Sequence, residues 1–121
     1  MSDTDLRTWQ NCLYTIDGDG KVIDIWEQWD YLCAGSDGPG PHRIRISPYD
    51  PERRVWVVNE TFHQIYVLSN DGSELLMTLG EKLTPGDDET HFGRPQDVAF
   101  LPDGRVLVAD GLDNHRVVIL D

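Results

Sequence analysis

The chain has 121 residues, of which 39% are hydrophobic, enough for the core of one ordinary domain. Lys and Arg number 10 against 22 Asp and Glu, and the resulting net charge of -12 argues against nucleic acid and membrane surfaces as partners. No apolar run approaches the roughly 18–20 residues of a membrane span, and the first residues lack the features of a signal peptide, so we expect a cytoplasmic protein.

Short apolar segments with alternating patterning predict β-strands along the whole chain, and no segment convincingly predicts a helix. Val, Ile and aromatic residues dominate these segments, as is usual on a pleated surface. Asx-Gly pairs such as Asp71-Gly72 supply the tight turns between them. In chain order, the nine predicted strands are 12–16, 22–26, 43–46, 55–58, 64–68, 74–79, 97–100, 105–109 and 116–120.

A repeat of about 50 residues and four strands organises these segments. Segment 41–48 resembles 95–102, segment 54–59 resembles 105–110, and segment 63–68 resembles both 115–120 and 11–16. With the four strands named a to d, the chain reads c-d over 10–27, a-b-c-d over 41–79 and a-b-c over 95–121. We therefore predict one partial propeller unit over 1–121, with a first blade over 41–79 and a second blade over 95–121 that lacks its own outer strand.

Four-stranded antiparallel repeats of about 40–50 residues are typical of β-propeller blades, which close into rings of about 4–8 blades. Two blades alone would leave an apolar sheet face open at each end. Either the chain is part of a longer protein, or copies of it close the ring, as a homotrimer with six blades would. One strand is then left over, because strands 12–16 and 116–120 are candidates for the same place.

The stretches Val108-Ala109-Asp110 and Asn114-His115-Arg116-Val117 resemble the strand ends of NHL repeats, so the predicted fold class is an all-β, NHL-type propeller. Residues 38–121 are more specifically similar to the peptidyl-α-hydroxyglycine α-amidating lyases and their bacterial relatives. The stretches that carry the resemblance are Pro41-His42, 55–57, 63–65, 79–80, 85–86, 91–92, Pro95 with 97–99, 110–111, Asn114 and Arg116.

The resemblance implies a six-bladed propeller whose axial zinc is held by three histidines, each from a Pro-His pair on alternate blades. Here His42 occupies such a pair, and Gln96 takes the matching place in the other blade. In a three-chain ring, one His42 from each chain would meet on the threefold axis and could hold Zn²⁺ with an open fourth position. The alternative is a metal-free histidine bonded to a backbone carbonyl.

Departures from the family make its activity doubtful. Leu112 stands where the lyases have an active-site tyrosine, and Arg43 stands where they have a calcium-binding acid. We expect a binding or structural propeller descended from a lyase-like ancestor, with a small-molecule or peptide ligand at the channel mouth. The alternative is a metal-dependent lyase or hydrolase built on His42, so whether the chain is an enzyme stays open.

Charged residues on the inner strands are the candidate ligand-binding set: Arg43, Arg45, Gln96 and Asp97. Arginines buried between blades need partners, and Asp97 on the next blade is the candidate. Such residues form either an inter-blade ion pair or an anion-binding ring.

Four other features are given structural roles. We expect His63 and His115 to share such a role, because they occupy equivalent repeat positions, and His91 to fix a loop. The acidic run 87–89 is interpreted as a solvated loop face. Cys12 and Cys33 are too few for a disulfide scaffold and are expected to be reduced thiols.

Overall fold

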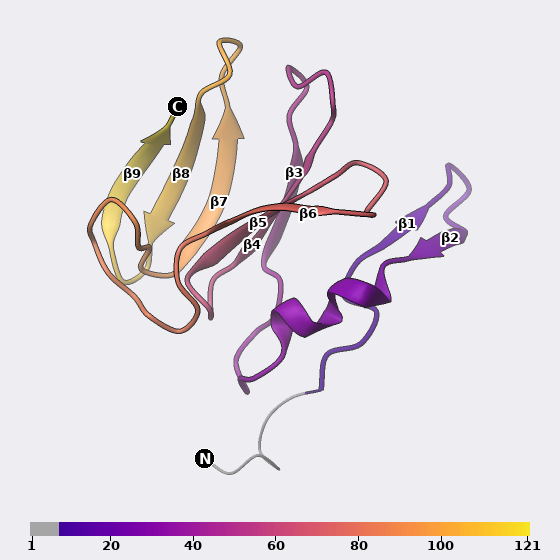
Figure 1. The fold of residues 1–121 in the computed structure, drawn as a ribbon, viewed down its shortest axis with the longest axis horizontal. Coiled ribbons are helices and arrows are strands. Elements are labelled where there is room, and N and C mark those ends of the chain that lie inside the picture. The colour runs from indigo at the N-terminus through magenta and orange to yellow at the C-terminus, as the bar shows by residue number, and fades with distance from the viewer. Residues whose placement is uncertain (1–7) are drawn as a thin grey trace. The chain divides into compact units, whose positions relative to one another are not determined.

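The computed structural model describes residues 8–121 and confirms the prediction of an all-β chain with nine strands in that range (Figure 1). The chain divides into two compact units, Met1–Gly40 and Pro41–Asp121, which are described separately. The strands are β1 (Tyr14–Ile16), β2 (Val22–Ile25), β3 (Arg43–Ile46), β4 (Val55–Asn59), β5 (Gln64–Leu68), β6 (Leu75–Leu79), β7 (Pro95–Phe100), β8 (Val106–Gly111) and β9 (His115–Leu120).

The first unit holds the β1–β2 hairpin and a short helix. Asp17 closes the hairpin turn, because its Oδ1 accepts the backbone N–H groups of Asp19 and Lys21, each at 2.9 Å. The helix after it, η2 (Glu27–Cys33), is a 3₁₀ helix, so the expectation of no helix is wrong here. Seven residues are too few to show helical periodicity in the sequence, which is why the pattern gave no signal.

The second unit consists of two antiparallel sheets with the strand orders β3-β4-β5-β6 and β7-β8-β9. These orders match the predicted a-b-c-d and a-b-c repeats. Within each sheet, every strand pairs with the next one along the chain. Figure 1 shows the two sheets beside each other. The inner strand β7 contacts both β3 and β4, so the first strands of the two repeats lie side by side.

The core lies between these two sheets, where Val58 and Ile65 of the first pack with Val98, Val106 and Val108 of the second. Trp56 and Phe100 add an edge-to-face contact, with ring centroids 5.7 Å apart. The sheets therefore pack face to face, as neighbouring propeller blades do.

The two sheets differ in how far they are covered, since β4 and β5 are buried on both faces whereas β9 keeps one face open. Ile65 and Val67 on β5 are 0% exposed, whereas their repeat counterparts on β9, Val117 and Ile119, are 63% and 55% exposed. Strand β3 is exposed throughout, so the expectation that its arginines are buried between blades is wrong for the single chain. No further sheet covers the open face of β9 within the second unit, whereas β3 is exposed although its Arg45 contacts Asp97 of the neighbouring sheet.

No helix in the described residues is both long enough and apolar enough to cross a bilayer.

Candidate functional site

The predicted partnership across the two inner strands is present. Arg45 donates two hydrogen bonds to Asp97, from Nε at 3.1 Å and from Nη2 at 2.9 Å, and Arg43 Nε lies 3.6 Å from the same carboxylate. The hydrogen bond from Arg45 is the main reason that the pKa of Asp97 lies below its ordinary value. Both arginine side chains are 45% exposed, so the cluster lies open to solvent.

The other two predicted residues meet at a carboxylate that the sequence did not point to, Glu60. Gln96 Nε2 donates to Glu60 Oε2 at 2.6 Å, while His42 Nδ1 lies 4.0 Å from Glu60 Oε1. Arg94 Nη2 lies 3.6 Å from Oε1 as well. The Glu60 side chain is only 8% exposed, so this is a nearly buried acid that joins both sheets.

A comparison of the repeats could have revealed Glu60. Val58-Asn59 at the end of β4 match Ala109-Asp110 of β8, so Glu60 and Gly111 are equivalent positions. A buried carboxylate where the other repeat has glycine marks a difference between blades, and buried acids are costly unless they are paired. This position was not predicted from the sequence, because those predictions rest on residues that the repeats share.

The surroundings of His42 fit the role of a metal ligand in one respect, the position of Glu60. A carboxylate beside one ring nitrogen is the usual way to orient a ligating histidine, and it leaves the other nitrogen for a metal. Within residues 8–121, however, no three His, Cys, Asp or Glu side chains are placed to share one ion. A zinc site at His42 would therefore need residues from further chains.

The NHL-like motif residues form a buried network with a structural role. Asp110 is 0% exposed and accepts the N–H of Gly93, Asn114 Nδ2 and Arg116 Nε, each at 2.8 Å. Arg116 then donates to the carbonyl oxygens of Asp87, Asp88 and His91. The motif thus ties the long loop before β7 to the second sheet.

The histidines outside the candidate set have mainly structural surroundings. His63 is buried, its Nδ1 accepts the N–H of Arg94 at 2.9 Å, and desolvation lowers its pKa. His115 is exposed, so its repeat position does not give it the same surroundings. His91 lies between Asp88 at 2.8 Å and Glu81 at 3.0 Å, in agreement with the expected loop-fixing role.

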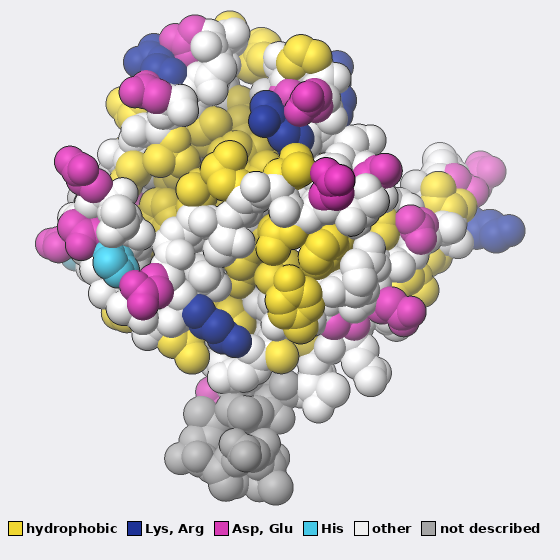
Figure 2. Space-filling view, in the orientation of Figure 1, with side chains coloured by type: hydrophobic (Ala, Val, Ile, Leu, Met, Phe, Trp, Pro, Cys, Tyr) yellow, Lys and Arg dark blue, Asp and Glu magenta, His cyan; other side chains and the backbone are white. Residues whose placement is uncertain are grey.

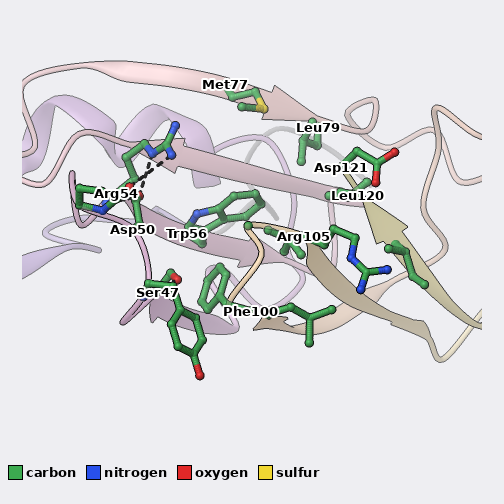
Figure 3. Close-up of a pocket in the computed structure, with 16 residues that line it drawn as sticks. Ser47, Asp50, Arg54, Trp56, Met77, Leu79, Phe100, Arg105, Leu120 and Asp121 are labelled. Atoms are coloured by element: carbon green, nitrogen blue, oxygen red, sulfur yellow. Dashed lines mark hydrogen bonds and ion pairs between the residues drawn. The ribbon is translucent and has the colours of Figure 1, made fainter.

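A cavity of about 520 Å³ opens between the two sheets at the far end of the inner strands, beside the β3–β4 and β7–β8 turns. Figure 2 shows it as a hollow of hydrophobic side chains between these turns. Trp56, Phe100 and Met77 line it, with the Asp50–Arg54 pair at its rim (Figure 3). None of the predicted ligand-binding residues lines this cavity. The cavity was not predicted from the sequence.

The two cysteines and Leu112 complete the predicted positions. Cys12 and Cys33 are unpaired thiols, and burial raises the pKa of Cys33 to about 12. Leu112 is 58% exposed in the β8–β9 turn and offers no group for proton transfer.

Comparisons with known proteins agree with this arrangement. The NHL repeat family matches residues 92–120. The chain is 37% identical over 81 residues to a probable peptidyl-alpha-hydroxyglycine alpha-amidating lyase of Caenorhabditis elegans, covering 67% of this chain and 22% of that protein. It is 39% identical over 80 residues to the peptidylglycine alpha-amidating monooxygenase of Rattus norvegicus, covering 64% of this chain and 8% of that protein.

A third relative extends the match toward the N-terminus. NHL repeat-containing protein 3 of Homo sapiens is 28% identical over 116 residues, covering 89% of this chain and 31% of that protein. The chain thus spans less than a third of the length of each of these relatives. It carries an NHL repeat and, over about two thirds of its length, is similar in sequence to the amidating lyases.

Proposed function

We propose that this chain is a building block of an NHL-type propeller, in which three copies close a six-bladed ring that serves as a ligand-binding or structural module. The observation that carries the proposal is the contrast between equivalent positions on β5 and β9. Ile65 is 0% exposed under a neighbouring sheet, whereas Val117 is 63% exposed. In the first repeat a neighbouring sheet covers this face of the blade. The same face of the second repeat therefore needs a further blade to cover it.

The ligand site of this assembly is the mouth of the channel, at Arg43, Arg45, Gln96 and Asp97. Arg43 and Arg45 are half exposed there, and together with Arg94 they outnumber the carboxylates of Asp97 and Glu60 by one positive charge. Arg45 is held by two hydrogen bonds to Asp97, whereas Arg43 makes the longer contact and is the better placed to meet a ligand. A small molecule or peptide with a carboxylate fits this chemistry.

Light scattering tests the assembly directly. We expect the purified chain to show three times its 13.8 kDa mass, over a range of concentrations. A species of the single-chain mass throughout that range would contradict the ring.

We propose that amidating-lyase turnover is absent, because Leu112 has no hydroxyl where the resemblance places a tyrosine. An assay with a peptidyl-α-hydroxyglycine should then show no product above the uncatalysed rate. Product formation that disappears in His42→Ala would instead establish the enzyme.

A metal-dependent lyase or hydrolase is the second candidate, and Glu60 is the observation that favours it. This nearly buried carboxylate beside His42 is the acid–base group that the sequence failed to supply. His42 from each of three chains would hold Zn²⁺, which would act as a Lewis acid when bound. Elemental analysis should then find one zinc per three chains, lost in His42→Ala; absence of zinc from a confirmed trimer would remove this candidate.

A further inference from the structure

Strand β9 has an unpaired edge on the side away from β8. In the first sheet of the second unit, β6 covers the equivalent edge of β5, with Tyr66 opposite Thr78 and Leu68 opposite Leu75. The register of that pair shifts between Val67 and Leu68. In the second sheet, β9 is the last strand, and an unpaired edge of this kind is a template for another strand.

The β1–β2 hairpin repeats the β5–β6 pairing, including its irregularity. Tyr14 lies opposite Ile25 and Ile16 opposite Val22, and the register shifts between Thr15 and Ile16. Moving along the chain by 52 residues takes Tyr14 to Tyr66 and Thr15 to Val67, so the two shifts fall at the same step of the repeat. Strand β2 is therefore shaped to pair with a strand of the β5 type.

Strand β9 is also a strand of this type. A further move of 52 residues takes Tyr66 to Val118 and Leu68 to Leu120, which would place Val118 opposite Ile25 and Leu120 opposite Val22. Position 17, whose N–H donates to the carbonyl of Lys21 in the hairpin, becomes Asp121. Both competing strands are thus followed by an aspartate at the position opposite Lys21.

We propose that β2 of one copy leaves its own β1 and pairs with β9 of a second copy, completing that copy's three-stranded sheet. The exchange replaces hydrogen bonds of a three-residue strand with those of a six-residue strand that already belongs to a packed sheet. It also accounts for the surplus strand, since β1 is the one displaced. The inference rests on the assembly of copies proposed above and names the contact that joins them.

Cysteine cross-linking tests the register. A Val118→Cys chain mixed with an Ile25→Cys chain, with a mild oxidant, should give a disulfide dimer containing one of each, identified by mass spectrometry of the linked peptides. A Val117→Cys chain is the matched control, because the same register sets Val117 beside Trp26, one residue from Ile25 and on the opposite face of the strand. Its link to Ile25→Cys should be much weaker.

Two further variants test the competition between strands. Thr15→Pro removes a donor from β1 alone and should shift assembly to lower chain concentrations. Ile119→Lys charges the open face of β9 and should shift assembly to higher concentrations. A trimer that forms without the 118–25 link overturns the strand exchange and leaves the ring standing, whereas a chain that stays monomeric overturns both.

Discussion

His91 shows how single side chains set the behaviour of this molecule. Asp88 first, and then Glu81, raise its pKa by accepting hydrogen bonds from the ring, so the folded protein favours the protonated form. A group whose pKa is raised on folding contributes stability that is complete below its unfolded value of about 6.5 and is lost as pH rises through the folded value. His63 acts in the opposite sense, because desolvation lowers its pKa.

We predict that His91→Gln reduces the free energy of unfolding at pH 5.5 more than at pH 8.5, both values being chosen to lie about one to two units either side of the ordinary histidine pKa. Urea unfolding of the two proteins at each pH measures this, and comparing variant with parent cancels the contribution of His63. An equal loss at both pH values would show that the ring acts by packing alone.

At the scale of the element, the end of β6 depends on a glycine, and any side chain in its place would disturb it. Gly80 has a φ of 82°, and a Cβ there would lie 2.2 Å from the backbone oxygen of His63. Gly104 in the β7–β8 turn has a φ of 96° with nothing within 4 Å of such a Cβ. The two positions therefore share the left-handed backbone but not the close approach.

We predict that Gly104→Ala costs about 1–2 kcal/mol through its backbone conformation, and that Gly80→Ala costs clearly more because two pieces of backbone must move apart. Thermal or urea unfolding of both variants gives the comparison. Equal losses would mean that the contact with His63 relaxes without cost.

Particular residues show which features of the structure the sequence predicted. Alternation and turn residues predicted all nine strands, and the sequence named Asp97 as the candidate partner of the inner-strand arginines, of which Arg45 lies 2.9 Å from it. The cavity beside Trp56 was missed because it depends on how two sheets face each other, whereas Glu60 was missed because it is a difference between the repeats and the prediction rested on what they share. Helix η2 was missed because its seven residues carry no periodic pattern.

At the scale of the whole molecule, charge opposes the proposed ring. Each chain carries -12, so three copies would carry -36, three times that value. Like charges repel over the Debye length, which falls from about 30 Å at 0.01 M salt to about 10 Å at 0.1 M.

We predict that added salt, from 0.01 M to 0.15 M, shifts the chain toward the trimer at fixed concentration, because screening weakens the repulsion more than the apolar contacts. Light scattering along this salt series measures the shift. A trimer that dissociates as salt is added would show instead that ion pairs between copies dominate.

The anchor formed by Arg116 has a consequence for protein engineering. It holds the loop before β7 by three carbonyl oxygens, those of Asp87, Asp88 and His91, and not by the side chains of Asp87 and Glu89. A backbone clamp of this kind accepts many different side chains in the segment that it grips. Positions 87 and 89 are therefore natural places to vary the sequence of the loop, whereas Asp88 and His91, whose side chains bond to each other, should be kept.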